Sequence, residues 1–372
     1  MLPKNIKQAI IKEDRNFMGG GSSFEMPIYN SSRHYKDLCN SDYYRALVVL
    51  RHFIKVVSDY YFGTKENAKN IDLFMLTSSV SSPIGPGSDS EPIIINLGEL
   101  KTYLVDSSQF GFEPLLLNNF DKVYCYLPSM RGENCDERHL NQFYHCEMEM
   151  KGELEQLFPI VEGYIKILAE AILLMDNIVN KISSDSAKTK QFLRIIIDTK
   201  NLPRITFDEA INILIKNNKK ELVNFTNQGN DISNDGELEL MRILQLDTPV
   251  WLTNFDRDRV PFYQKIDPLN QNKTLNADLL FPQIIMDSFG GEIIGAGQRQ
   301  DNPEEIYESL KRQNHISSQP YEWYIDLRRQ PGYTTTSGFG MGIERFIAWA
   351  LGKDNVRDVI LYPRIKNVKT YP

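Results

Sequence analysis

The chain has 372 residues, of which 41% are hydrophobic and 24% are charged. This composition excludes a disordered protein and predicts one large globular domain or two smaller ones. The formal net charge of −7 argues against a broad basic surface that would bind DNA, RNA or an anionic membrane.

In the first third of the chain, one helix and several short strands are predicted. Residues 1–40 form a lead segment, interrupted by the flexible stretch MGGGSS at 18–23. Apolar residues at helical spacing predict a helix over 43–62, with Gly63 as its end. The Pro-, Gly- and Ser-rich stretch 78–92 predicts a loop. Short apolar runs predict strands at residues 92–96, 102–106 and 122–127.

The rest of the chain alternates between helical and strand patterns. A long amphipathic helix is predicted over 153–182. At 201–218 a strand or turn leads into a helix, with Thr206 as its N-cap and Glu209 completing a capping box. The remaining predicted elements are strands across 249–300 and a helix at 304–313. Hairpins alternating with separate helices favour the α+β class.

The stretch RGENCDERHLNQF (131–143) places many charges between two apolar, strand-like runs. Within it, Arg131 and Glu133 alternate onto one face of the first strand, and Arg138 and His139 close one end. This arrangement predicts a floor that binds a highly charged anion, such as a nucleoside triphosphate. A half-solvated hairpin with crossing salt bridges explains the same residues equally well.

The strand that follows, HLNQFYHCEMEM, has two chemically different faces. A period of two places Phe143, His145, Glu147 and Glu149 on a polar face. The alternate residues form the core face, and they are Tyr144, Cys146, Met148 and Met150. Glu147 and Glu149 could also be charges at a sheet edge, and His145 is more often structural.

The C-terminal stretch SGFGMGIERFIAWALG (337–352) predicts a glycine-stepped strand that runs into a helix. The glycines, including Gly342, permit a close approach of the backbone. Arg345 lies in the first helical turn, where a cation opposes the helix dipole. Its position therefore indicates a compensating anion or carboxylate.

Together these two segments resemble motifs 2 and 3 of class II aminoacyl-tRNA synthetases, in the subgroup for aspartate, asparagine and lysine. Asparaginyl-tRNA synthetases are the most similar, through stretches such as YLVDSSQFGFEPLLL, PVWLTNFDRDRVPFYQK, GGEIIGAGQRQ and YEWYIDLRRQPGY. The similarity covers roughly residues 43–364. It implies a catalytic domain over 41–372, with an antiparallel sheet flanked by helices and a helical insertion at about 153–245. It also implies a homodimer whose interface contains the first amphipathic helix.

The resemblance implies a site for ATP. Arg131 would hold the α-phosphate and the acyl carboxylate, and Glu133 the adenine end. Phe143 would stack on adenine, and Arg345 would close on its other face and on the γ-phosphate. The implied ATP-binding residues are Arg131, Glu133, Arg138, His139, Phe143, Glu292, Gly342 and Arg345. Of these, Arg131, Glu133 and Arg345 are the implied catalytic residues.

The resemblance also implies a metal site and an amino-acid pocket. Asp278 and Glu292 would bind Mg²⁺. The implied amino-acid-binding residues are Gln109, Glu113, Arg299 and Arg328. Arg328 could equally be a salt-bridge partner. Relatives specific for aspartate carry a lysine where this chain has Phe112, followed by Glu113, so asparagine is expected to be preferred over aspartate.

Several features depart from the family pattern. Members of the subgroup carry an N-terminal β-barrel that reads the anticodon, and the first residues of this chain do not read as such a barrel. Gln300 replaces an acid, and Thr336 replaces a histidine. The stretch SPIGPGSDSEP is closer to stand-alone asparagine synthetases, and in it Asp89 or Glu91 could replace a missing ligand of the amino group. Extra chain, QIIMDSFG, precedes Glu292.

We therefore expect an enzyme that activates asparagine, or a close analogue, as an aminoacyl-adenylate. Transfer to an amine, ammonia or a carrier is expected, and transfer to tRNA is not. The alternatives are an asparagine synthetase using aspartate and ammonia, a truncated asparaginyl-tRNA synthetase, and a catalytically inactive regulatory paralogue. No DNA or membrane partner is expected.

The cellular location is predicted from cysteine usage and the N-terminus. Cys39, Cys125, Cys135 and Cys146 show no C-x-x-C spacing, which favours reduced thiols over a zinc site or a disulfide framework. No secretory signal is evident, and no apolar run is long enough to span a membrane. A cytoplasmic protein is expected.

Overall fold

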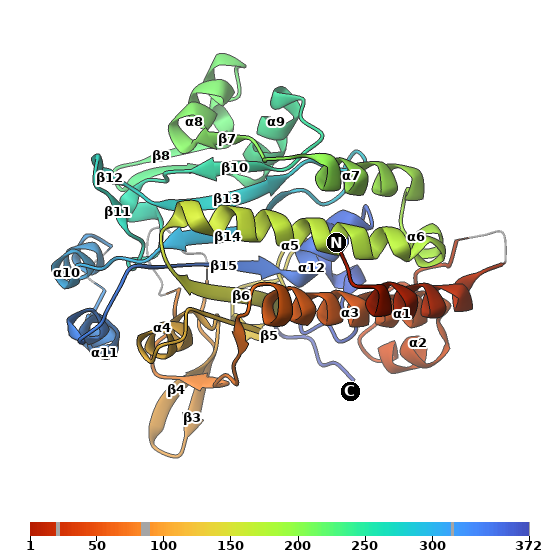
Figure 1. Cartoon of the computed structure of the whole chain (residues 1–372), viewed down its shortest axis with the longest axis horizontal. Helices are drawn as coiled ribbons and strands as arrows, with labels where there is room; N and C mark the ends of the chain where they lie inside the picture. The colour runs from red at the N-terminus through yellow and green to blue at the C-terminus, as the bar shows by residue number, and fades with distance from the viewer. Residues whose placement is uncertain (20–22, 83–89, 314–315, 372) are drawn as a thin grey trace.

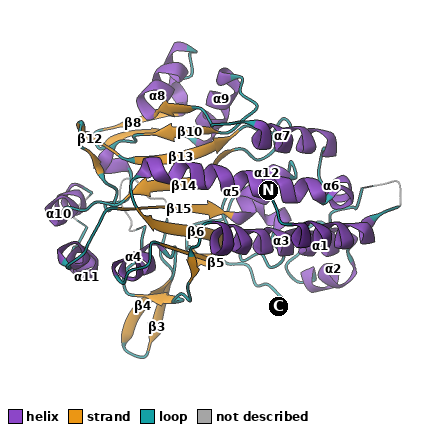
Figure 2. Cartoon of the chain, in the orientation of Figure 1, coloured by secondary structure: helices purple, strands orange, loops and turns teal. Residues whose placement is uncertain are grey.

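The computed structural model describes residues 1–19, 23–82, 90–313 and 316–371. Its centre is a twisted sheet (Figures 1 and 2). In spatial order, its strands are β1 (Lys69–Asn70), β5 (Lys122–Met130), β6 (Gln142–Lys151), β15 (Thr336–Gly342), β14 (Gly291–Gln298), β13 (Asn276–Phe281), β10 (Val250–Thr253) and β7 (Arg204–Thr206). The pair at each end is parallel and the pairs between them are antiparallel. The predicted α+β class is confirmed.

Smaller sheets lie around the central one. They are β2 (Leu76–Thr77) with β4 (Leu100–Leu104) and β3 (Ile94–Leu97), β8 (Val223–Thr226) with β9 (Gly229–Ile232), and β11 (Ile266–Asp267) with β12 (Asn270–Thr274). The strands predicted at 92–96 and 102–106 therefore exist, with bounds shifted by about two residues.

Helices cover the sheet. They are α1 (Lys4–Asp14), α2 (His34–Asn40), α3 (Asp42–Asp59), α4 (Gln109–Leu117), α5 (Leu154–Leu174), α6 (Asp176–Ile182), α7 (Ser186–Asp198), α8 (Phe207–Lys216), α9 (Asn234–Leu244), α10 (Pro303–Arg312), α11 (Glu322–Asp326) and α12 (Ile343–Ala350). Figure 1 shows α3 and α5 side by side across one face of the sheet. Among the described residues, no helix combines the length and the apolar character that crossing a bilayer requires.

The two faces of β6 divide the molecule into core and site. Cys146 and Met148 are fully buried and belong to the main core cluster with residues of α3, α5 and α12. Glu147 and Glu149 project to the opposite face and are also buried. The alternation predicted for this strand is therefore confirmed, but both carboxylates lie inside the protein and not at a sheet edge.

Two predicted helix ends are wrong, for identifiable reasons. The first helix continues beyond α3 in a π-helical turn to Lys65, so Gly63 lies inside it. The helix predicted over 153–182 breaks at Met175. There, the carboxylate of Asp14 accepts the backbone N–H groups of Asn177 and Ile178, at 3.1 and 2.9 Å, and so caps a new helix.

The N-terminal segment is packed into the molecule. Leu2, Ile10 and Phe17 are buried in the main core cluster, and α1 contacts α5. Residues on both sides of the boundary predicted at residue 40 share this core cluster, as Phe17 and Tyr43 do. Later in the chain, the predicted capping box is confirmed, because Thr206 and Glu209 exchange side chain-to-backbone hydrogen bonds at the start of α8.

A buried ion pair fixes the start of α12 against α3. The guanidinium of Arg51 donates to the carboxylate of Glu344 at 2.7 Å, and both side chains are nearly inaccessible. The second carboxylate oxygen of Glu344 accepts the backbone N–H of Tyr144 in β6 at 2.8 Å. The residue after Glu344 is Arg345, so this pair sets where the helix presents that arginine.

Replacing Arg51 by alanine should therefore cost about 3–5 kcal/mol of unfolding free energy, because it leaves the buried Glu344 carboxylate without its cation. Urea unfolding measures the change. Arg45 is the matched control on the same helix, since its side chain is 61% exposed and lies 3.8 Å from Asp42. Arg45→Ala should cost less than about 1 kcal/mol. Equal effects of the two substitutions would contradict the assignment.

Candidate active site

A stiff loop between β5 and β6 carries the first group of candidate residues. Arg131 and Glu133 lie in this loop and not in a strand, because β5 ends at Met130. The side chain of Asn141 donates to the backbone carbonyls of both Arg131 and Glu133, at 2.8 Å each. The backbone of a charged loop is thereby held in one conformation.

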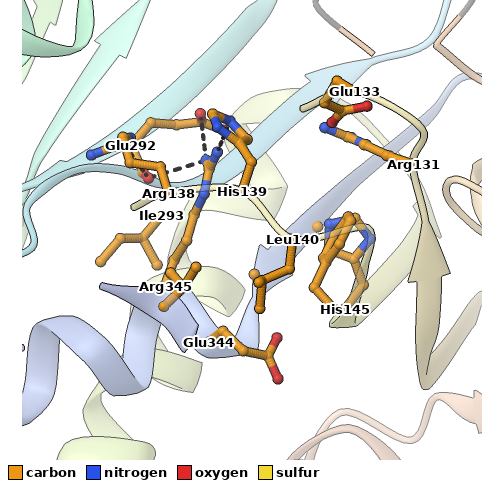
Figure 3. A pocket seen from close by; sticks show the side chains of 14 residues that line it. Arg131, Glu133, Arg138, His139, Leu140, His145, Glu292, Ile293, Glu344 and Arg345 are labelled. Atoms are coloured by element: carbon orange, nitrogen blue, oxygen red, sulfur yellow. Dashed lines mark hydrogen bonds and ion pairs between the residues drawn. The ribbon is translucent and has the colours of Figure 1, made fainter. Parts of the chain in front are cut away.

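The predicted phosphate-binding residues do converge (Figure 3). They line a cavity of about 120 Å³ at the carboxyl end of β15 and the start of α12. The candidates on its wall are Arg131, Glu133, Arg138, His139, Phe143, Glu292, Gly342 and Arg345. Five guanidinium or imidazole groups, including that of His145, face a single small volume, which is the arrangement expected of an anion site.

Arg345 has the carboxylate partner that its position in the helix indicated. It donates to Glu292 at 2.8 Å and to the Nε2 atom of His139 at 3.1 Å. Because arginine cannot accept, Nε2 is the acceptor and the ring proton lies on Nδ1, which contacts Asp136 at 2.8 Å. Burial disfavours ionisation of Glu292, but the guanidinium groups of Arg345 and Arg138 outweigh it and lower its pKa.

Two further groups complete the basic wall. Arg138 donates to the backbone carbonyl of Gly290 at 2.6 Å and lies 4.6 Å from the ring centroid of Phe289. The guanidinium of Arg131 lies 5.4 Å from the ring centroid of Phe143. One face of the ring predicted to stack on adenine is therefore covered by Arg131.

The carboxylates predicted to bind Mg²⁺ lie above the same glycine. A Cβ on Gly295 would lie 3.5 Å from Asp278 Oδ1 and 3.7 Å from Glu292 Oε1. Burial, with the charges of Glu292 and Glu237, raises the pKa of Asp278 well above its usual value. Glu292 lines both cavities and Asp278 lines the larger one, so two neighbouring carboxyl groups fit Mg²⁺, which binds few carboxylates together with substrate oxygens. In the described part of the chain, no larger group of metal-ligating side chains exists.

Glu237 is a residue of this region that the sequence did not identify. It reaches from α9 and accepts the backbone N–H of Glu292 at 2.9 Å, and it lies 3.9 Å from Arg138. Burial raises its pKa to about 7. No sequence motif surrounds Glu237. Its place beside Glu292 results from the packing of α9 against β14.

A second cavity of about 850 Å³ opens beside the first and shares Arg131, His139 and Arg345 with it. Gln109 and Arg299, two of the predicted amino-acid-binding residues, line it. Arg299 is fully buried beside Glu149, with two parallel N–H···O bonds of 2.9 and 2.8 Å. This fork raises the pKa of the guanidinium, so Arg299 is permanently charged.

Glu113 and Arg328 lie outside the described cavities, and Arg328 is a salt-bridge partner, the alternative that the sequence left open. They form a buried ion pair of 2.9 Å with each other, and Tyr324 donates to Glu113. Arg328 also donates to the backbone carbonyl of Gln300 at 2.9 Å. Neither residue of the pair lines the described cavities. The pair instead ties α4, which carries Gln109, to the segment after Arg299.

The glycine-stepped strand β15 makes room for carboxylates of its neighbour. A Cβ on Gly338 would collide with Glu149, and one on Gly340 would lie 3.1 Å from Glu147. Glu147 in turn accepts the backbone N–H of Ser108, at the start of α4, at 2.7 Å. The glycines therefore serve the acidic residues of β6, in addition to lining the cavities.

The residues that depart from the family pattern lie in different parts of the structure. Gln300 accepts the backbone N–H of Asn302 at 3.1 Å and does not line the described cavities, and Thr336 is buried. Asp89 lies outside the described residues. Glu91 is exposed and pairs with Lys366 at 2.7 Å. All four cysteines are free thiols, as expected.

Known proteins are similar along most of the chain. The family model for class II tRNA synthetases (D, K and N) matches residues 30–366. The asparagine–tRNA ligase of Pyrococcus abyssi is 31% identical over 276 residues, which are 73% of this chain and 58% of that protein. The probable cytoplasmic asparagine–tRNA ligase of Encephalitozoon cuniculi is 31% identical over 84% of this chain and 65% of that protein.

Solved structures agree. The asparaginyl-tRNA synthetase from Pyrococcus horikoshii, complexed with asparaginyl-adenylate, has a TM-score of 0.78 and 26% identity, over 92% of this chain and 73% of that chain. The aspartyl-tRNA synthetase from Entamoeba histolytica, at 19% identity and a TM-score of 0.71, supports the fold alone. This chain spans about three fifths of the length of the curated relatives it matches. Since the family model matches most of the sequence, the chain belongs to the class II tRNA synthetases (D, K and N).

Proposed function

We propose that this protein uses MgATP to activate asparagine, or a close analogue, as an enzyme-bound aminoacyl-adenylate. The observation that carries the proposal is the shared wall of the two cavities. Arg131, His139 and Arg345 line both. A triphosphate in the basic cavity and an amino acid in the larger one would meet at these two arginines and this histidine, where a carboxylate can attack the α-phosphate and release pyrophosphate.

Each step of this reaction can be assigned to side chains of the site. A substrate carboxylate is already a nucleophile, so catalysis consists of positioning and charge neutralisation. Arg131, Glu133 and Arg345 are the catalytic residues of the proposal. In the proposal, Phe143 supplies the aromatic face for adenine, and Arg131, whose guanidinium lies 5.4 Å from that ring, holds the α-phosphate. Mg²⁺ would neutralise phosphate charge.

Arg345→Ala should reduce ATP–pyrophosphate exchange about a hundredfold or more, because one preorganised cation is removed from the transferring phosphate. The unfolding transition should change little, since the Arg345 side chain is partly exposed. Arg329, which is 46% exposed and lies beside Glu304, is the control, and Arg329→Ala should keep normal exchange. A folded Arg345→Ala variant with near-normal exchange would refute the assignment.

The charge balance of the larger cavity favours an uncharged amino-acid side chain. Arg299 already has a partner in Glu149, and Glu113 has one in Arg328, so neither pair offers a free cation. Glu147 adds a buried carboxylate to the same wall. A substrate carboxylate buried there would be poorly compensated, whereas a carboxamide adds no charge. The argument does not use Glu113, which was expected to bind the amino acid, because Glu113 is paired with Arg328.

Asparagine should therefore bind more tightly than aspartate. Isothermal titration of both amino acids, with a non-hydrolysable ATP analogue and Mg²⁺ present, measures the difference. Tighter binding of aspartate would favour the alternative enzyme, an asparagine synthetase that uses aspartate and ammonia. Binding of neither amino acid, together with normal binding of the analogue, would favour the inactive regulatory paralogue.

The acceptor of the acyl group is a separate part of the proposal. We infer a non-tRNA acceptor, such as an amine, ammonia or a carrier, and its support is the net charge of −7, which disfavours a polyanion. The relatives named asparagine–tRNA ligases make tRNA the competing acceptor. Incubation with radiolabelled asparagine, MgATP and bulk tRNA should give little acid-precipitable label. Robust acylation of tRNA would overturn the inference and support a plain synthetase.

A cytoplasmic homodimer is also part of the proposal. The apolar stripe of α3, expected at the dimer interface, is largely buried within the chain. Exposed apolar side chains gather instead on and beside the small sheet of β2, β4 and β3, and they are Phe74, Met75, Leu76, Ile94, Leu97 and Leu100. Such a patch is typical of a subunit interface.

A further inference from the structure

Two glycines on neighbouring strands form a flat platform next to Ala296 and Phe339, which line the larger cavity. Gly297 of β14 pairs with Gly338 of β15, and Gly338 pairs with Glu149 of β6. The space above Gly338 is filled by the carboxylate of Glu149. The space above Gly297 is filled by the carboxamide of Gln264, whose Cδ would lie 2.7 Å from a Cβ at that position.

Gln264 is held firmly over this platform. The backbone of Gln264 forms an antiparallel bridge with Arg299, so the two side chains project to the same side of the sheet. Backbone bonds flank the bridge, from Lys265 to Gln298 at 2.8 Å and from Gln300 to Tyr263 at 2.8 Å. Phe262 and Tyr263, next to Gln264, are buried in an aromatic cluster. The segment therefore cannot swing away without disrupting that cluster.

The carboxamide of Gln264 is incompletely hydrogen-bonded. Its Oε1 atom is buried and has no hydrogen-bond partner among the described residues. The Nε2 atom of Gln109, on the same cavity wall, is buried without a partner in the described structure too. Buried polar atoms normally form hydrogen bonds. An acceptor and a donor without partners in one cavity therefore indicate a ligand that donates a hydrogen bond to the first and accepts one from the second.

We propose that Gln264 is a further specificity-determining residue, whose carboxamide selects an amino acid with an uncharged, N–H-bearing side chain. The inference rests on the proposed function and names the side chain that reads the substrate. The oxygen of Gln264 accepts the substrate N–H, while Arg299, fixed by Glu149, lies beside it. Gly297 is required because any larger residue would displace the carboxamide from the platform.

The kinetic test uses Gln264→Met, which keeps the length of the side chain and removes its polar end. The KM for asparagine in pyrophosphate exchange should rise about tenfold, with the KM for ATP and kcat within about twofold of wild type. Aspartate β-methyl ester has the same carbonyl but no side-chain N–H. The preference for asparagine over this ester should fall by a similar factor. Gln271→Met, on the exposed end of β12, is the control and should change neither value.

The packing test does not depend on activity. Gly297→Ala should lower the melting temperature, because the new methyl group meets the carboxamide of Gln264. Adding Gln264→Ala should recover most of the loss, and strictly additive effects would show that the two residues are not in contact.

The outcomes separate the two claims. A wild-type protein without exchange for any amino acid overturns both the proposed function and this inference. An active wild type whose Gln264→Met variant keeps its KM for asparagine, or loses ATP affinity equally, overturns the inference alone.

Discussion

The buried pair of Arg299 and Glu149 spans three strands of the central sheet. It can form because β15, the strand between its partners, carries Gly338 where any side chain would collide with the carboxylate. Removing either charge would leave the other unpaired and buried, at a cost of about 3–5 kcal/mol. The floor of the larger cavity, the position of Gln109 across it and the bridge to Gln264 all depend on strands held in this register.

The two cavities differ in their electrostatic balance. In the larger one, Arg299 is paired with Glu149, and the neighbouring Arg328 is paired with Glu113. In the smaller one, several cations converge, and among the residues that the structure describes only Glu292 forms an ion pair with Arg345. Under the proposed function, this difference favours the polyanionic substrate in the smaller cavity and the uncharged end of the second substrate in the larger one. The proposed function therefore depends on which cavity contains positive charge without a carboxylate partner.

Part of the site could be predicted from local sequence, because that part lies on regular elements, whereas Arg131 and Glu133 lie in a loop. The period of two in β6 identified its polar face, and the unfavourable place of Arg345 in a helix indicated a partner, found as Glu292. The capping box at Thr206 was equally local. In β6 and in the capping box the relevant neighbours lie within a few residues, where spacing determines geometry, whereas Glu292 lies 53 residues from Arg345 and was not identified by spacing.

Contacts between distant segments could not be predicted in this way. Asp14, near the N-terminus, caps the helix that begins after Met175. Glu237 of α9 accepts the backbone N–H of Glu292 in β14. Glu113 and Arg328 each carried a plausible role in ligand binding until the fold brought them together. No local sequence pattern identifies Gln264, because the place of its carboxamide depends on Gly297, over which it lies.

The most direct test is ATP–pyrophosphate exchange by the wild-type protein, measured with each of the common amino acids in the presence and absence of Mg²⁺. The account predicts Mg²⁺-dependent exchange that is strongest with asparagine and much weaker with aspartate. No exchange with any amino acid, by a protein that is folded and binds ATP, would contradict it.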